Sequence, residues 1–131
     1  VNEFFIACGG CGFPVGREGN HLTGASAVID KDWTSSLLAQ EVDADVLIIL
    51  TAIEKAAINY GKENQQWLEH ITVEEAEKHI QNGEFAEGSM KPKMEAAVAF
   101  AKSKAGRKAI ITQLEKSREG IEGKTGTHIE L

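Results

Sequence analysis

The chain has 131 residues and a mass of 14.2 kDa, the size of one ordinary domain. Its apolar fraction of 42% and charged fraction of 26% are typical of a globular protein and exclude a disordered or fibrous one. The net charge of −6 disfavours a general nucleic-acid binder, which needs a basic face. Two cysteines cannot form a disulfide framework, and no secretory signal or bilayer-length apolar run is evident, so we expect a cytoplasmic protein.

The first predicted element is a strand over residues 4–8, where an unbroken apolar run ends at Gly9 and Gly10. Runs without polar alternation are typical of parallel strands, so we expect this strand to be buried on both faces. Residues 9–27 hold six glycines and Pro14, which indicates a loop or a hairpin.

A helix and two strands are predicted next. Asp30 has the side chain of a helix N-cap, so we expect a helix over about residues 31–42. Residues 46–50 form another unbroken apolar run and predict a second strand buried on both faces. Residues 56–60 predict a short strand, followed by a polar loop through residues 65–66.

The second half of the chain carries clear helix signals. Thr72 and Glu75 have the spacing of a capping box, and the helix they start is expected to reach Asn82 and to close at Gly83 in a left-handed cap. Residues 88–93 open another helix, with Pro92 in its first turn and apolar residues at helical spacing: Met94, Ala97, Val98 and Ala101.

A strand over residues 108–112, a short helix over 113–122 and a closing strand over 127–131 complete the chain. Strands that alternate with helices indicate an α/β fold, so we expect a mostly parallel sheet with helices on both faces. Ligands of such sheets bind beyond the carboxyl ends of the strands, which directs attention to the residues after each apolar run.

Three segments at these places have the composition of a phosphate site. Gly9, Gly10 and Gly12 allow backbone amides to approach an anion, although a tight turn alone would also explain them. Lys31 lies between two carboxylates at a helix start, where an ammonium held by Asp30 or Asp32 could face a phosphoryl group.

The third segment, residues 88–93, places a hydroxyl and two lysines at another helix start. Ordinary helix starts with exposed lysines remain the alternative at both helices. The three segments together favour phosphate binding more strongly than any one of them.

The two cysteines, Cys8 and Cys11, have the spacing of a redox pair or of half a zinc site. No second such pair exists, and the four histidines lack ligand spacing, so a metal site is disfavoured. A thiol-based regulator that uses these two residues remains a separate hypothesis.

The motifs taken together resemble the carbamate kinases of the amino acid kinase superfamily. The resemblance rests on residues 27–32 (Ala-Val-Ile-Asp-Lys-Asp), on Gly-Ser-Met at 88–90 with Pro-Lys at 92–93, on the 9–15 loop, on 59–62 (Asn-Tyr-Gly-Lys) and on Gly-Thr at 126–127. It covers the 131 residues in order but only the C-terminal, nucleotide-binding part of that family. We therefore expect residues 1–131 to be that portion of an amino acid kinase-like domain, with the N-terminal half absent and apolar edges exposed.

The resemblance implies an activity: reversible phosphoryl transfer between MgATP and carbamate, used mostly to make ATP from carbamoyl phosphate in arginine fermentation. It implies ATP or ADP as cofactor, with Mg²⁺ held mainly by the nucleotide phosphates, and a homodimer as the assembly, with no nucleic-acid or membrane partner. Lys31 and Lys93 would neutralise the transferring phosphoryl group, and Asp32 would orient the lysines.

The resemblance also implies a nucleotide site. The 51–60 segment would wall the nucleotide, the 88–90 segment would lie near its phosphates, and the glycines of the 9–12 loop would approach the transferred group. The contacts expected from these segments are Thr51, Ile53, Glu54, Ile58 and Tyr60, then Gly88, Ser89 and Met90, and Gly9, Gly10 and Gly12.

The sequence departs from the family pattern at three places. Cys11 interrupts the glycine loop, Ala52 stands where many members have aspartate, and Glu63 replaces a common proline. These departures keep two alternatives open: a non-catalytic nucleotide-binding module, and a kinase for a different small carboxylate.

Overall fold

The computed structural model describes residues 3–7, 14–26 and 30–131. Its main sheet has four strands in the order β3, β7, β8, β6, namely Val46–Thr51, Lys108–Gln113, Thr127–Glu130 and His70–Thr72. β3 pairs with β7 in parallel and β6 with β8 in parallel, whereas β7 and β8 run antiparallel. The predicted α/β class and the mostly parallel sheet are confirmed, with one antiparallel pair that the sequence did not indicate.

The turn into β8 brings two strands into unusually close approach. Gly126 has a φ of +89°, and a Cβ at this residue would lie 3.1 Å from the Ile111 carbonyl oxygen and 3.1 Å from Thr112 Cβ. Both the backbone conformation and the contact with β7 therefore require glycine.

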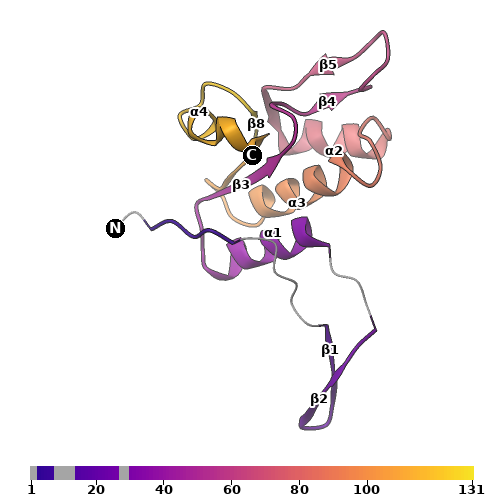
Figure 1. The fold of residues 1–131 in the computed structure, drawn as a ribbon, viewed down its shortest axis with the longest axis vertical. Helices are drawn as coiled ribbons and strands as arrows, with labels where there is room; N and C mark the ends of the chain where they lie inside the picture. The colour runs from indigo at the N-terminus through magenta and orange to yellow at the C-terminus, as the bar shows by residue number, and fades with distance from the viewer. Residues whose placement is uncertain (1–2, 8–13, 27–29) are drawn as a thin grey trace.

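Helices cover both faces of the sheet, as predicted. On one face α1 (Lys31–Glu41), α3 (Met90–Lys102) and α2 (Val73–Gln81) lie side by side (Figure 1). On the other face the 3₁₀ turn η1 (Leu114–Lys116) leads into α4 (Ser117–Ile121). α4 approaches β7 so closely that a Cβ on Gly120 would lie 3.0 Å from Thr112 Cγ2.

The helix ends form as their local sequences predict. The Asp30 carboxylate accepts hydrogen bonds from the amides of Asp32 at 2.8 Å and Trp33 at 3.1 Å, which begins α1. The Thr72 hydroxyl and the Glu75 carboxylate form the complete capping box of α2. Gly83 has a φ of +67°, the left-handed conformation expected after that helix.

α3 is the centre of the hydrophobic core. Met94, Ala97, Phe100 and Ala101 are fully buried, in agreement with the predicted helical spacing of this segment. They pack in one cluster with Ala109 and Ile111 of β7, Ile129 of β8, and residues of α1 and α2. Burial of each large apolar side chain stabilises the fold by roughly 1.5–3 kcal/mol.

Two small hairpins project from this body. β1 (Val15–Glu18) and β2 (His21–Gly24) pair antiparallel and are exposed throughout, which confirms the hairpin expectation for this part of the 9–27 segment. β4 (Ala57–Ile58) pairs with β5 (Gln66–Trp67). The sequence analysis missed β5 and β6, because strands of two and three residues show no measurable periodicity.

Two predictions about the first strands are wrong. Residues 4–7 form no strand, and Phe4, Phe5 and Ile6 are 81%, 67% and 89% exposed, because no strand of the described ranges lies beside them. β3 is at an edge of the sheet and is not buried on both faces: Leu47 and Ile49 face the core, while Val46 and Leu50 are more than two-fifths exposed. Within the described part of the chain, no helix is long and apolar enough to cross a membrane.

Candidate functional site

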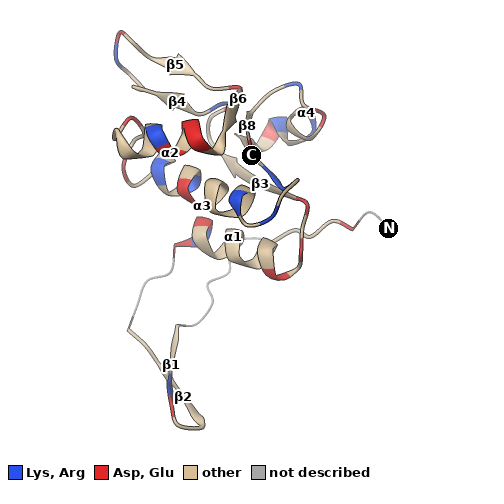
Figure 2. Cartoon of the chain, turned by 180° about the vertical axis from the view of Figure 1, so that it is seen from behind, with Lys and Arg blue, Asp and Glu red and all other residues tan. Residues whose placement is uncertain are grey.

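The first turns of α1 and α3 meet at an ion pair. Lys93 Nζ donates to both carboxylate oxygens of Asp32, at 2.9 and 3.2 Å, across 61 residues of sequence. The two side chains are 22% and 18% exposed, so a ligand can still reach them. Figure 2 shows the acidic start of α1 beside the basic start of α3. Both helices begin at the edge of the sheet where β3 and β7 end, which is the edge where parallel sheets bind ligands.

The beginning of α3 has the character of an anion site. Ser89 occupies the N-cap position without any side-chain hydrogen bond to the helix, unlike Asp30 of α1 and Thr72 of α2. Gly88 before it has a φ of +75°, and both residues are exposed. Amides without a capping side chain, together with the helix dipole, favour a negative group at this position.

Lys31 is exposed as the first residue of α1, and the expected ion pairs with its neighbours do not form. The Asp30 carboxylate is used to cap the helix, and the Asp32 carboxylate is held by Lys93. Lys31 thus forms no salt bridge with any residue in the described ranges.

The predicted nucleotide wall begins at the end of β3. Thr51 and Ile53 are half-buried, and Ile53 packs against the core. The Glu54 carboxylate accepts a hydrogen bond from the Thr125 hydroxyl, and the Glu54 carbonyl oxygen accepts one from the Thr112 hydroxyl at 3.3 Å. Two threonines therefore hold this side of the wall, Thr112 in β7 and Thr125 just before β8.

The remaining predicted contacts differ in how accessible they are. Ile58 and Met90 are each only 7% exposed, because their side chains belong to the hydrophobic core. Tyr60 is 57% exposed and packs edge-to-face against Trp67, with ring centroids 6.1 Å apart. Tyr60 therefore offers a side chain to a ligand, whereas Ile58 and Met90 offer little beyond their backbone.

Sequence reasoning missed the residues that support this wall. Thr127 Oγ1 accepts a hydrogen bond from the Ala56 amide at 2.8 Å and donates one to the Leu68 carbonyl oxygen at 2.6 Å. One hydroxyl thus holds both ends of the β4–β5 hairpin. These contacts join residues that are 59 or 71 positions apart, and no local pattern indicates them.

Several predicted residues lie outside the described ranges: Gly9, Gly10, Gly12, Cys8 and Cys11. Among the described residues, no group of three or more His, Cys, Asp or Glu side chains could hold a metal ion. The site edge does offer Lys93 and the uncapped start of α3, a donor set that suits the phosphates of a metal-bound nucleotide.

The amino acid kinase family model matches residues 2–113. The chain belongs to this family. It is 65% identical over 129 residues to the carbamate kinase-like protein YqeA of Escherichia coli, which covers 98% of this chain and 42% of that protein. It is 51% identical to the carbamate kinase of Pyrococcus horikoshii, over 95% of this chain and 39% of that enzyme.

Among solved structures, the carbamate kinase from Giardia lamblia bound to AMP-PNP matches with a TM-score of 0.85 and 42% identity, over 89% of this chain and 37% of that one. A protein from Aeropyrum pernix matches with a TM-score of 0.83. The chain spans about two-fifths of the length of these relatives.

Proposed function

We propose that this chain is the C-terminal, nucleotide-binding portion of a carbamate kinase. The reaction is reversible phosphoryl transfer between MgATP and carbamate, in cells mainly ATP synthesis from carbamoyl phosphate and ADP during arginine fermentation. The observation that carries the proposal is the Lys93–Asp32 pair at the beginnings of two helices, on the carboxyl edge of the sheet. The whole enzyme, with the portion that the relatives have in addition, is a cytoplasmic homodimer.

Two lysines at this edge supply the positive charge that phosphoryl transfer needs. Lys93 carries an ammonium held in a fixed direction by Asp32, so it neutralises charge on the phosphoryl group without reorganising. Lys31, exposed one residue before Asp32, adds a second ammonium on the same helix start. Phosphoryl transfer needs little covalent help from the protein, so positioning and electrostatic stabilisation supply most of the rate.

The nucleotide lies along the wall from Thr51 to Tyr60, with its phosphates toward Gly88 and Ser89. Exposed Tyr60, supported by Trp67, offers an aromatic surface to a base. Mg²⁺ would be held mainly by the nucleotide phosphates and would supply positive charge that offsets theirs. The similarity to a solved carbamate kinase that is bound to AMP-PNP supports nucleotide binding.

The test is the effect of Lys93→Ala in the polypeptide that contains this chain together with the remaining portion of the kinase. We expect kcat for ATP formation from carbamoyl phosphate and MgADP to fall by about 10²–10³, the usual loss for one preorganised electrostatic donor. Lys102→Ala is the matched control: this lysine ends the same helix and pairs with Glu77 on the surface, so activity stays unchanged. Near-normal activity of Lys93→Ala would refute the assigned role.

A second candidate is a nucleotide-binding module without catalysis. It is favoured by Ala52, which stands where many family members have aspartate, and by the E. coli relative, which is itself described as carbamate kinase-like. Calorimetric titration with MgADP distinguishes the two functions. Binding that depends on Lys93, with no ATP formation by the polypeptide that carries the remaining portion, would establish the module and exclude the kinase.

A further inference from the structure

The β4–β5 hairpin projects from the main sheet (Figure 1), and a side chain of β8 interrupts its base. Ala56 and Leu68 face each other one step beyond the paired residues Ala57 and Trp67. The Leu68 amide donates to the Ala56 carbonyl oxygen at 2.8 Å, which marks a hydrogen-bonded pair of antiparallel strands. In such a pair the Ala56 amide would donate back to the Leu68 carbonyl oxygen. Here it donates to Thr127 Oγ1 at 2.8 Å, and this hydroxyl donates to the Leu68 carbonyl oxygen at 2.6 Å.

The Thr127 hydroxyl thus takes the place of one ladder contact of the hairpin, although it belongs to another sheet. Thr127 is fully buried and is the first residue of β8, directly after the left-handed turn at Gly126. One residue further on, the His128 amide donates to the Glu69 carbonyl oxygen at 2.7 Å, where the chain leaves the hairpin and begins to pair with β8. The position of the hairpin base is therefore set by β8 and not by the hairpin alone.

Two other contacts keep the hairpin folded if this hydroxyl is removed. Ile58 belongs to the hydrophobic core, and the Asn59 amide donates to the Glu84 carbonyl oxygen at 3.1 Å. Without the hydroxyl, the buried Ala56 amide either lacks an acceptor, which is costly, or donates directly to the Leu68 carbonyl oxygen. Direct closure brings the two strands together at their base and releases them from β8. Removal of the hydroxyl should therefore shift the hairpin rather than unfold it.

We propose that Thr127 is a positioning residue for the nucleotide, because it fixes the base of the hairpin that carries Tyr60 and Trp67. This inference rests on the proposed function, in which the segment from Thr51 to Tyr60 is the wall of the nucleotide site and includes β4. Tyr60 and Trp67 form an edge-to-face pair and are both more than half exposed. Because Thr127 is fully buried, it acts on a ligand through the hairpin and not by contact.

The test compares Thr127→Val with Thr127→Ser in the polypeptide that contains this chain together with the remaining portion of the kinase. Valine keeps the branched shape of threonine but neither accepts nor donates a hydrogen bond, whereas serine keeps the hydroxyl. We expect Thr127→Val to raise the KM for MgADP about tenfold and to leave kcat within about twofold, because the hairpin acts on nucleotide binding and not on the transferring phosphoryl group. Thr127→Ser should have a KM close to that of the wild type.

A merely structural role of Thr127 predicts a different result. It would lower the fraction of folded enzyme and therefore the apparent kcat, while the KM of the folded enzyme stayed normal. Ser36→Ala is the control for the loss of a buried hydroxyl outside the hairpin: Ser36 lies in α1, accepts a hydrogen bond from Gln40 Nε2 at 3.3 Å, and should not affect KM. If Thr127→Val does not fold, Thr127→Ala gives the same comparison without an added methyl group. A normal KM in the folded variant would overturn the proposal.

NMR spectra of the same variants without nucleotide test the structural half of the proposal separately. We expect the amide signals of residues 56–68 to shift in Thr127→Val and to return in Thr127→Ser, while Ser36→Ala leaves them unchanged. Unchanged hairpin signals in Thr127→Val would also overturn the proposal. A wild-type polypeptide that forms no ATP would refute the proposed function, whereas a wild type that forms ATP, with a normal KM in Thr127→Val, would refute the positioning role alone.

Discussion

α1 and α3 are joined at both ends by ion pairs, and the two ends are built differently. At the site edge Asp32 pairs with Lys93; at the opposite edge Asp43 pairs with Lys104, and each pair spans 61 residues. The equal separation shows that the two helices run in the same direction and in register.

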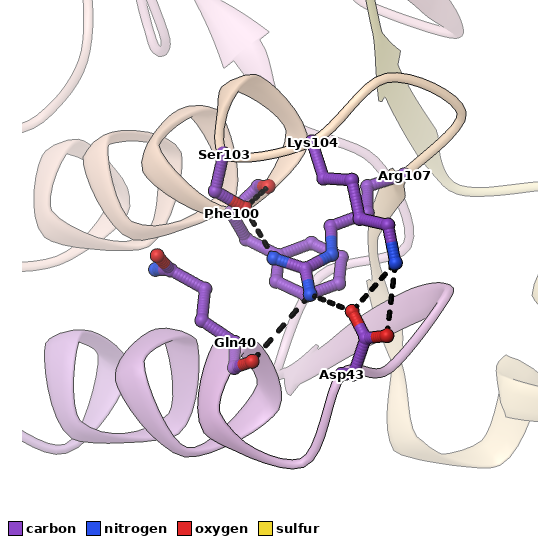
Figure 3. A network of polar contacts seen from close by, with 6 residues as sticks. All are labelled: Gln40, Asp43, Phe100, Ser103, Lys104 and Arg107. Atoms are coloured by element: carbon purple, nitrogen blue, oxygen red, sulfur yellow. Dashed lines mark hydrogen bonds and ion pairs between the residues drawn. The ribbon is translucent and has the colours of Figure 1, made fainter.

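The far end is a closed network (Figure 3). Arg107 is only 6% exposed, lies 5.1 Å above the centre of the Phe100 ring, and donates to Ser103 Oγ at 2.6 Å and to Asp43 Oδ1 at 2.7 Å. The pKa of Asp43 lies below its ordinary value, mainly because of the Lys104 ammonium and to a smaller extent because of Arg107. Both terminal nitrogens of Arg107 have partners, whereas its buried Nε has none among the described residues, so the clamp that these residues form is held by the two ends of the guanidinium.

The near end is simpler and more open. Lys93 is the only described residue that donates a side-chain hydrogen bond to Asp32, and α3 begins there without a capping side chain. The difference between the two ends separates stability from function: one end holds the helices together, and the other keeps donors that can bind a ligand.

The largest expected effect comes from removing the aromatic floor of the clamp. Phe100→Ala leaves a cavity under Arg107 at a fully buried position, so we expect the free energy of unfolding to fall by about 3–5 kcal/mol. Urea unfolding followed by circular dichroism measures it. Tyr60→Ala, at an exposed ring, is the comparison and should cost much less.

Arg107→Met removes the guanidinium from the clamp and retains an apolar side chain of similar length over Phe100. The loss of the hydrogen bonds that Arg107 donates to Ser103 and Asp43 should reduce the free energy of unfolding by roughly 1–3 kcal/mol. Arg118→Met, which removes an exposed pair within α4, is the control and should change stability very little. Equal losses in both variants would contradict the clamp.

Lys93→Met should affect ligand binding and leave stability nearly unchanged, whereas Arg107→Met should lower stability. Its partly exposed pair with Asp32 contributes about 1 kcal/mol or less to stability, so unfolding of the Lys93 variant by urea should be nearly unchanged. MgADP binding, measured by calorimetry, should be weakened. A large fall in stability with binding retained would reverse the roles assigned to the two ends.

Acidification should weaken the clamp end. Because the pKa of Asp43 is lowered by folding from 3.8, its contribution to stability is present above pH 3.8 and is lost as the pH falls through the lower, folded value. Asp43→Asn removes this dependence, and asparagine tolerates the φ of +52° at this position. We expect urea midpoints between pH 2 and pH 6 to fall less steeply for Asp43→Asn than for the wild type.

Local signals in the sequence were sufficient for most of the elements. Asp30, Thr72 and Gly83 act on amides within a few residues, so their helices could be predicted with accurate ends. The contacts that build the site are of another kind: Asp32 with Lys93, and Glu54 with Thr125, are 61 and 71 residues apart. Composition suggested phosphate at both helix starts, the family resemblance implied that Asp32 orients Lys93, and the fold brings these two side chains together.

The wrong prediction of a first strand shows what a local sequence pattern cannot provide. The pattern of residues 4–7 predicts burial on both faces, and burial depends on neighbours that a local pattern does not contain. The alternation of β3 between core and solvent arises in the same way, because one face of the strand packs on the core and the other is less covered.

Gly126 has a consequence for how this chain can evolve. A single methyl group there would lie 3.1 Å from the carbonyl oxygen of Ile111, at a φ of +89° that residues with a side chain rarely adopt, so even alanine would strain the turn into β8. Selection for a folded sheet alone keeps glycine at 126, whereas under the proposed function only selection for phosphoryl transfer keeps lysine at 93. In a lineage that has lost catalysis but kept the fold, the second residue should drift while the first stays fixed.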